Sequence, residues 1–218
     1  MLILGLERDL KYLSGNYMDK KPIKGEYLEV LLRSPKTIFS TKDTSLLWNE
    51  NNESIITDRL KKYVKVGKLI RVRYGLYAKD KNYNRFELAT RINTPSYVSF
   101  ETVLGASGIT FQYYGNIFVA SYMNRRMEVD GQKITFVRMK DYVLSNTVGI
   151  EHVDDYARAT KERAFLDRIY VSKNYYFDNL RPLDWEKVFE ILPIYHNKSM
   201  ENRVKKQYEN FNNKFKEK

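Results

Sequence analysis

The spacing of apolar residues changes abruptly in one basic stretch of the chain. Residues 54–68 place apolar side chains at the spacing of one helical face, namely Ile56, Leu60 and Val64. Gly67 is suited to end such a helix because glycine adopts the left-handed conformation without strain. From Leu69 onward, apolar and basic residues alternate with the period of a β-strand, and Gly75 offers a turn. The sequence therefore predicts a helix followed directly by a tight hairpin.

Two further helices are predicted before this pair. Residues 22–35 carry an apolar face made of Tyr27, Val30 and Leu31. Residues 39–50 begin with Ser40 and Asp43 at the spacing of a capping box. Three helices followed by a hairpin, across residues 21–82, is the element order of a winged helix-turn-helix. Domains that bind only protein also have this order, so that alternative stays open.

The positive charge of the chain is concentrated around this pattern. The formal net charge is +11, and residues 59–85 contribute ten Lys or Arg against the single acid Asp80, a net of +9. Residues 197–218 hold seven Lys or Arg against three Glu, a net of +4. Subtracting both from +11 leaves −2 for the rest of the chain. A localised surface for a polyanion is indicated, and a solvated basic face without a partner is the alternative.

A winged helix-turn-helix would place the basic helix in the major groove of DNA and the hairpin near the backbone. Residues at the helix start would read base edges, and the cations would contact phosphates. Ser54 is also expected to cap this helix. The candidate DNA-binding residues are Asn52, Ser54, Thr57, Arg59, Lys61, Lys62, Lys65, Arg71, Arg73 and Tyr74. Neutralising about six phosphates would give log affinity a slope of about −5 against log salt. Lys79 and Lys81 are assigned to solvent.

The remainder of the chain predicts a second unit of a different kind. Residues 83–196 combine short helices with strands rich in aromatic and β-branched residues. The expected fold class is therefore α+β, with an N-terminal winged helix-turn-helix followed by a mixed α+β domain. Strands are expected at 109–122 and 125–139, the second turning at Asp130-Gly131, and helices at 85–92, after Ser99, after Thr160 and near Asp184. A short helix at residues 1–20 and a polar, basic helix at 197–218 complete the predicted domains.

Sequence signatures of an enzyme are lacking. The chain has no Cys and only two His, and it has no glycine-rich loop of the kind that cradles phosphates. The stretch HVDD at 152–155 is interpreted as a polar loop and not as a metal site. A nuclease-like set of Glu128, Asp130 and Lys133 is the catalytic alternative, although Asp130 is already explained by the hairpin turn. We expect a cytoplasmic protein with no enzyme activity, no cofactor and no membrane contact, because no run approaches the roughly 18 apolar residues of a membrane span.

Three segments of the chain carry a resemblance to a known family. The stretch GKLIRVRYGLYAK, with Gly75-x-Tyr77, is similar to an Arg-Gly-x-Tyr element that closes a winged helix. PSYVSFETVLGASGIT is similar to a Pro-x-x-Ser segment followed by a helix of small residues. ATKERAFLDRIY resembles a Thr-x-x-Glu-Arg-Thr-Leu-Leu-Asp helix, with Ala164 and Phe165 as departures. In this order the segments, within residues 22–195, resemble the AbiEi-type antitoxins, transcriptional regulators of type IV toxin–antitoxin and abortive-infection systems.

The resemblance implies a repressor that binds inverted repeats in double-stranded DNA upstream of its own operon, as a monomer in solution or cooperatively on DNA. The second domain would antagonise a nucleotidyltransferase toxin without forming a stable complex. The motif residues of that domain are assigned structural roles: Tyr97, Ser99, Glu162, Arg163 and Asp167. Arg163 and Asp167 lie four residues apart and can pair on one helix. The alternatives are a winged-helix module for an acidic protein partner and a stand-alone regulator without a toxin.

Overall fold

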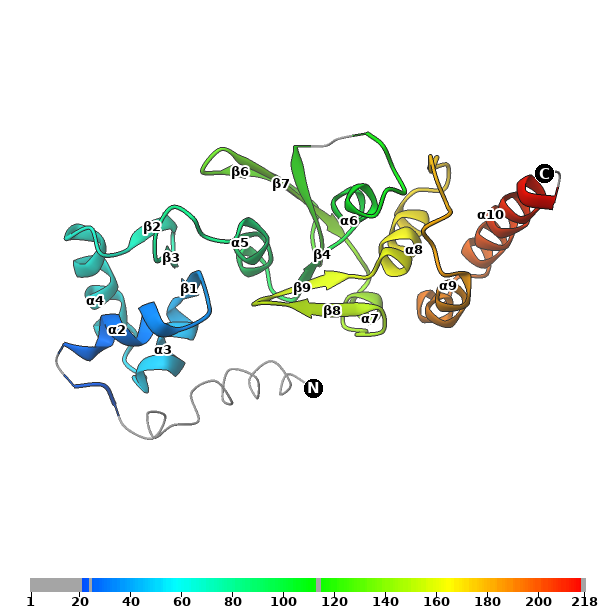
Figure 1. Cartoon of the computed structure of the whole chain (residues 1–218). Coiled ribbons are helices and arrows are strands. Elements are labelled where there is room, and N and C mark those ends of the chain that lie inside the picture. The colour runs from blue at the N-terminus through cyan, green and yellow to red at the C-terminus, as the bar shows by residue number, and fades with distance from the viewer. Residues whose placement is uncertain (1–20, 24, 113–114, 217–218) are drawn as a thin grey trace. The chain divides into compact units, whose positions relative to one another are not determined.

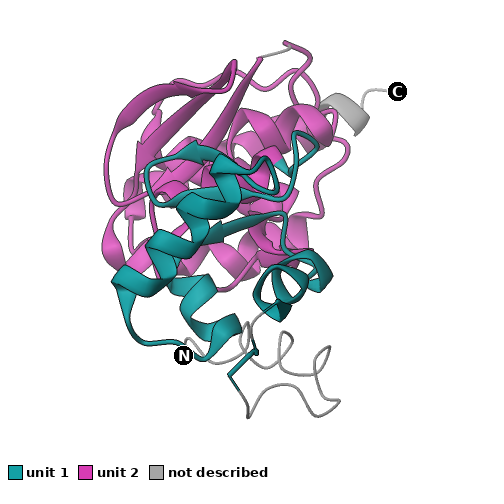
Figure 2. Ribbon diagram, turned by 90° about the vertical axis from the view of Figure 1, so that its left-hand side faces the viewer, with its two compact units in different colours: residues 1–84 teal, residues 85–218 magenta. Residues whose placement is uncertain are grey.

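The computed structural model describes residues 21–23, 25–112 and 115–216 (Figure 1). The chain divides into two compact units, Met1–Asn84 and Arg85–Lys218, which Figure 2 colours separately. Each unit contains both helices and a sheet, so the α+β class expected from the sequence is confirmed. The helix expected at residues 1–20 lies outside the described residues.

Unit 1 has the three helices and the hairpin that the sequence predicts, together with one strand that it does not. Its elements are α2 (Glu26–Arg33), β1 (Ile38–Ser40), α3 (Thr41–Trp48), α4 (Glu53–Lys65), β2 (Ile70–Arg73) and β3 (Leu76–Ala78). The strands form an antiparallel sheet in the order β1–β3–β2. The unpredicted strand β1 extends the hairpin into a sheet, because its three residues pair with β3.

The ends of these helices follow from their capping residues. Ser40 and Asp43 form the predicted capping box at the start of α3. Asn52, and not Ser54, is the N-cap of α4, because its side-chain oxygen accepts the backbone N–H groups of the first turn. At the other end, Gly67 has a φ of 70°, and the Lys68 N–H donates to the Tyr63 carbonyl at 2.8 Å. This is the left-handed termination expected at Gly67.

The core of unit 1 gathers around one tryptophan. Trp48 is fully buried, and its indole N–H donates to the Tyr27 carbonyl at 2.8 Å. The Tyr27 ring meets the Trp48 ring edge-on at a centroid distance of 5.3 Å. The other buried members of this core are Leu31, Phe39, Ile56, Leu60, Leu69 and Tyr77. With Trp48 and Tyr27 included, every element of unit 1 except β2 contributes to this cluster, so its burial holds the helices on the sheet.

Unit 2 is built on a six-stranded mixed sheet. Its elements are α5 (Arg85–Ile92), β4 (Ser96–Val98), α6 (Glu101–Ala106), β5 (Asn116–Ser121), β6 (Arg125–Val129), β7 (Gln132–Arg138), α7 (Asp141–Leu144), β8 (Ile150–Val153), β9 (Tyr156–Ala159), α8 (Lys161–Val171), α9 (Trp185–Ile191), the 3-10 helix η1 (Leu192–Tyr195) and α10 (Lys198–Lys216). The strand order is β6–β7–β5–β4–β9–β8. The pairs β5–β7 and β4–β9 are parallel, and the others are antiparallel.

Several local predictions for unit 2 are confirmed, and others are wrong. The hairpin between β6 and β7 turns at Asp130-Gly131, where both residues have positive φ. Thr160 and Asp184 cap α8 and α9 as expected. Ser99 does not cap α6, because the N-cap is Phe100 and Ser99 turns its hydroxyl to another partner. The stretch HVDD is not a loop: His152 lies in β8, and Asp154 begins the turn into β9.

Helix α8 is the central helix of unit 2. It lies between the sheet and α9 (Figure 1) and also packs against α6 and α10. Its buried residues follow one another without a polar face: Glu162, Arg163, Ala164, Phe165, Leu166, Asp167 and Ile169. Because residues 162–167 are all buried, the polar groups among them must pair inside the protein.

The polar C-terminal helix docks on unit 2. Val204 of α10 is fully buried. The rings of Tyr208 and Phe211 lie 5.0 and 5.7 Å from the Trp185 ring of α9. The apolar residues of this largely polar helix therefore form a packing face.

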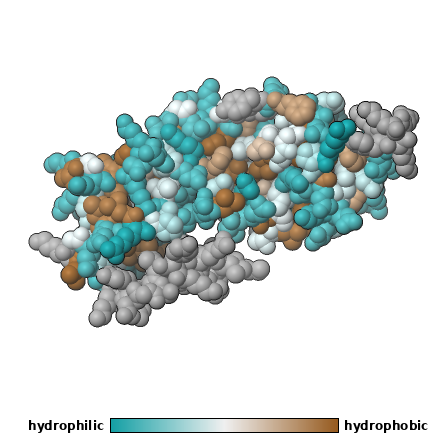
Figure 3. Space-filling model, in the orientation of Figure 1, coloured by the Kyte–Doolittle hydropathy of each residue, from teal (hydrophilic) through white to brown (hydrophobic). Residues whose placement is uncertain are grey.

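The face of the molecule drawn in Figure 3 is mostly polar. Hydrophilic side chains cover most of the face shown in Figure 3, and hydrophobic ones form small patches between them. The small hydrophobic patches on this face do not indicate a binding surface. The concentration of positive charge in residues 59–85 is the stronger indication.

Candidate functional site

The start of α4 holds the residues that were expected to read bases. The Asn52 side-chain oxygen accepts hydrogen bonds from the N–H groups of Ser54 and Ile55, at 3.0 and 3.3 Å. Ser54 is exposed in the first turn, and Thr57 is half-buried. Because capping engages its oxygen, Asn52 would contact a base through its amide group, as a donor.

Four lysines are exposed along α4 and the turn after it, namely Lys61, Lys62, Lys65 and Lys68. The Lys61 amine lies 3.6 Å from the Asp58 carboxylate, and both side chains are mostly exposed. The other three lysines form no ion pair with any residue that the structure describes. Lys62 and Lys65 also lie in the last turn, where positive charge stabilises the helix dipole by about 0.3–1 kcal/mol.

Arg59 does not belong to this exposed set. Its guanidinium carbon lies 3.4 Å from the centre of the Tyr27 ring and 5.6 Å from that of Trp48. One terminal nitrogen is buried, without a hydrogen-bond partner among the described residues. Arg59, which was expected to contact phosphate, thus stacks on the aromatic core of unit 1. Such cation–π stacking is worth about 0.5–2 kcal/mol.

The β2–β3 hairpin presents Arg71 and Tyr74 to solvent. Tyr74 is 88% exposed at the tip, and the Arg71 guanidinium lies 5.2 Å from its ring centre. The pairing register shifts between Arg71 and Arg73, so a bulge interrupts the strict alternation of the strand. Arg71 is exposed while Arg73 is half-buried.

The exposed cations define one candidate site, which we call the basic surface: Lys61, Lys62, Lys65, Lys68 and Arg71. They follow one another from α4 through the turn at Gly67 into β2. Lys79 lies outside this set, because its amine donates to the Ser34 carbonyl and ties β3 to the end of α2. The basic surface thus carries five cations, and among the residues that the structure describes only Lys61 lies near an acidic side chain, that of Asp58.

A buried polar network in unit 2 brings together four of the five motif residues named above. Arg163 and Asp167 are fully buried, and their Nε and Oδ1 atoms lie 3.2 Å apart, as the spacing of four residues predicts. The Ser99 hydroxyl donates to Asp167 Oδ2 at 2.7 Å. Arg163 Nη2 donates to the Tyr97 hydroxyl at 3.0 Å. The structural assignment of these residues therefore agrees with their positions.

Sequence reasoning missed one member of this network, Tyr195. Its hydroxyl donates to Asp167 Oδ1 at 2.7 Å from the end of the 3-10 helix η1. Arg163 also fixes a neighbouring segment, because its terminal nitrogens donate to the carbonyls of Val143 and Val148, both at 2.7 Å. No spacing rule links Tyr195 to α8, since 28 residues separate it from Asp167.

The electrostatics of the network keep its tyrosines neutral. Burial raises the pKa of Tyr97 well above its ordinary value, and the nearby charge of Asp167 raises it further. The same two causes raise the pKa of Tyr195. For Arg163, burial disfavours the charged form, but the charge of Asp167 and the two tyrosines outweigh it and raise the pKa of the guanidinium. Every member is at most 2% exposed, so the network lies in the interior of unit 2.

The fifth motif residue, Glu162, has a separate structural role. Its side chain is buried, and Oε1 accepts the backbone N–H of Asp184 at 3.1 Å. Asp184 is the N-cap of α9. Glu162 therefore connects the start of α8 to the start of α9.

The residues of the catalytic alternative lie at the β6–β7 hairpin. Glu128 and Lys133 are direct neighbours across the two strands. Asp130 occupies the turn, where its carboxylate lies 3.1 Å from an Arg85 nitrogen. Among the described residues, no group of three or more His, Asp or Glu side chains is placed to hold a metal ion. In the same part of the chain, no helix is both long and apolar enough to cross a membrane.

Comparison with known proteins leaves this geometry as the main guide to function. No protein-family model matches the chain, and no curated protein matches its sequence.

Proposed function

We propose that residues 21–82 form a winged helix-turn-helix that binds double-stranded DNA, and that the protein is the antitoxin and autorepressor of a type IV toxin–antitoxin system. The basic surface carries the DNA-binding part of this proposal. Lys62, Lys65, Lys68 and Arg71 are exposed and have no acidic partner among the described residues. Repulsion between these like charges does not stabilise the domain, so their clustering favours a polyanionic ligand. The antitoxin part is supported by the resemblance of three segments to the AbiEi-type family.

In this proposal α4 enters the major groove and the β2–β3 hairpin follows the backbone. Lys61 and Lys65 lie on the side of α4 opposite its buried residues, as does Ser54 near the helix start. The lysines would contact phosphates, and Ser54 with the Asn52 amide would contact base edges. Arg71 and Tyr74 would meet the sugar–phosphate backbone from the hairpin tip.

The salt dependence of binding can be calculated from the basic surface. Arg59 is engaged by aromatic rings and Arg73 is half-buried, so five cations remain to neutralise phosphates. Five phosphate contacts give log affinity a slope of about −4.5 against log salt. The slope is therefore expected to be slightly shallower than the −5 calculated for about six contacts from the sequence.

Fluorescence anisotropy with DNA from upstream of the operon tests this part. The full chain should bind with the stated slope, and a variant with Lys61→Glu, Lys65→Glu and Arg71→Glu should lose binding by at least a hundredfold, on the order of 1–3 kcal/mol per contact. Lys173→Glu is the matched control, because Lys173 is exposed in unit 2. No salt-sensitive binding at micromolar protein would overturn the repressor and favour the alternative of an acidic protein partner.

Co-expression with a nucleotidyltransferase encoded beside the gene tests the antitoxin part. The triple charge-reversal variant should still rescue growth, because the network and fold of unit 2 are untouched by it. Alanine at Glu128, Asp130 and Lys133 should also leave rescue intact. A wild-type chain that binds the operator but does not rescue growth would leave the stand-alone regulator as the function.

A further inference from the structure

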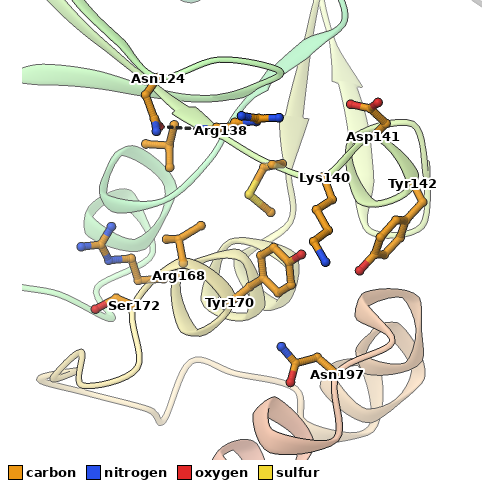
Figure 4. A pocket seen from close by; sticks show the side chains of 12 residues that line it. Asn124, Arg138, Lys140, Asp141, Tyr142, Arg168, Tyr170, Ser172 and Asn197 are labelled. Atoms are coloured by element: carbon orange, nitrogen blue, oxygen red, sulfur yellow. Dashed lines mark hydrogen bonds between the residues drawn. The ribbon is translucent and has the colours of Figure 1, made fainter.

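Unit 2 contains a hollow of about 1090 Å³ that the proposed function does not use. It is lined by the end of β7, the start of α7, the last turns of α8 and the residue before α10 (Figure 4). Ligand sites in proteins commonly measure about 300–1,000 Å³, and this hollow lies just above that range, so it has room for a small organic molecule.

The charges that line the hollow are mainly positive. Arg138, Lys140 and Arg168 line it, against the single carboxylate of Asp141. Arg138 and Lys140 are exposed and form no ion pair with a described residue. Figure 4 shows Lys140 pointing into the hollow and Asp141 pointing away from it. The hollow therefore has two uncompensated cations available to a ligand.

Arg168 gives the hollow a cation that is already held in place. Its Nε lies 3.1 Å from a carboxylate oxygen of Glu101. Its guanidinium carbon also lies 4.4 Å from the centre of the Tyr175 ring. A side chain fixed on two sides loses little entropy when a ligand binds beside it.

Two asparagines add donors to the same hollow. The Asn124 oxygen accepts the Arg138 N–H at 2.8 Å, and the Asn197 oxygen accepts the Met200 N–H at 3.0 Å. Neither amide nitrogen has a hydrogen-bond partner among the described residues. Both side chains thus offer N–H groups, which suit the acceptor atoms of an anion or a heterocycle.

Two aromatic rings stand at fixed positions beside Lys140. The Tyr142 hydroxyl donates to the Tyr195 carbonyl at 3.1 Å. Burial and, to a smaller extent, the hydrogen bond with Tyr142 raise the pKa of Tyr170 to about 12. The Tyr170 hydroxyl therefore stays protonated and can donate a hydrogen bond. Rings held in this way can stack on a planar group.

A second hollow in unit 2 differs from the first because its cations are paired with acidic residues. It measures about 580 Å³, and its cations have acidic neighbours in the same wall. Arg158 lies 3.1 Å from Glu151, and Lys187 lies 3.8 Å from Asp184. That hollow offers no surplus charge to a ligand.

We propose that the larger hollow binds a nucleoside triphosphate, with its phosphates on the two uncompensated cations Arg138 and Lys140, beside the Arg168 side chain that Glu101 and Tyr175 hold in place. The surplus of cations and N–H donors selects phosphates over neutral ligands. Phosphate groups alone would not fill the hollow. Its volume, its tyrosine rings and its asparagine amides also accommodate a base and a sugar. This site is separate from the basic surface and does not depend on DNA binding.

Isothermal titration of the full chain tests the site. The four common nucleoside triphosphates, tripolyphosphate and adenosine are the probes, and at least one triphosphate should bind with a micromolar Kd. Lys140→Ala and Arg138→Ala should each weaken that binding about tenfold, which corresponds to one charge-assisted contact. Lys65→Ala and Lys173→Ala should leave the Kd unchanged. Thermal unfolding of each variant without ligand should match that of the parent, since all four side chains are exposed.

Three results would overturn the assignment. The first is the absence of saturable binding for all four triphosphates at millimolar concentration. The second is tripolyphosphate binding as tightly as the best triphosphate, which would show that the nucleoside makes no contact. The third is an equal loss of affinity in Lys65→Ala, which would show general attraction to a basic protein.

Discussion

The substitution Asp167→Asn should destabilise unit 2 severely, although it changes only one side-chain group. The Asp167 carboxylate accepts hydrogen bonds from Ser99 and Tyr195, both at 2.7 Å, and faces the Arg163 guanidinium at 3.2 Å. Asparagine keeps one acceptor oxygen, replaces the other with a donor, and leaves the buried Arg163 charge without its counter-ion. Loss of one partner from a buried ion pair costs about 3–5 kcal/mol.

Urea unfolding in a Trp48→Phe background measures this cost. The chain has two tryptophans, so the remaining one, Trp185, reports on unit 2. With a slope of about 2 kcal/mol per molar urea, a loss of about 3 kcal/mol lowers the midpoint by about 1.5 M. Asp154→Asn is the matched control, because Asp154 is exposed at a positive φ that asparagine also adopts. Its free energy of unfolding should change by less than about 0.5 kcal/mol.

A double variant separates the ion pair from its surroundings. Arg163→Met combined with Asp167→Asn should lose at least about 1 kcal/mol less than the sum of the single variants, because neither charge is then left unpaired. If Asp167→Asn alone shifts the midpoint by no more than the Asp154→Asn control, at an unchanged slope, the network does not stabilise unit 2 as described.

Two other predictions concern the same region. Gly149→Ala should cost about 2–3 kcal/mol in the same urea assay, because Gly149 has a φ of 74° and a Cβ there would lie 2.9 Å from the Arg163 Cβ; an unchanged midpoint would contradict this packing. Alkaline titration should unfold unit 2 cooperatively, because the raised pKa values of Tyr97 and Tyr195 make their stabilising effect complete below about pH 10 and lost as the pH rises through the folded values. Tyrosinate absorbance should therefore rise in two phases: a gradual one as tyrosines with ordinary pKa values ionise, and a cooperative one as unit 2 unfolds and Tyr97 and Tyr195 ionise. A single non-cooperative phase would refute the prediction.

Local chemistry made much of the fold predictable. Gly67 and the Asp130-Gly131 turn supply positive φ, and Ser40 and Thr160 supply capping oxygens, so the breaks between elements could be located from neighbouring residues. The α4 N-cap was misplaced because both Asn52 and Ser54 can cap, and only the structure shows which oxygen accepts the N–H groups. Strand β1 was missed because three residues carry too short a pattern for a period of two.

The candidate sites were less predictable than the fold, because they depend on contacts between distant segments. Charge alone assigned Arg59 to the DNA-binding set, whereas its place over Tyr27 depends on how α4 packs on α2. Tyr195 joins Asp167 only after the chain returns to α8. The larger hollow likewise combines residues such as Asn124 and Asn197 that no local motif connects.

Arg163 and Asp167 contact residues that are far from them in the sequence, and this affects how unit 2 folds. Ser99 lies 68 residues before Asp167, Tyr97 lies 66 before Arg163, and Tyr195 lies 32 after it. Contacts of such long sequence separation form slowly, because the entropy cost of closing the long loops is incurred before the contacts stabilise the chain. During synthesis, α8 must therefore wait for the segment after residue 190 before it can bury its ion pair. A chain cut before Tyr195 should expose α8 as an aggregation-prone intermediate instead of folding into a smaller domain.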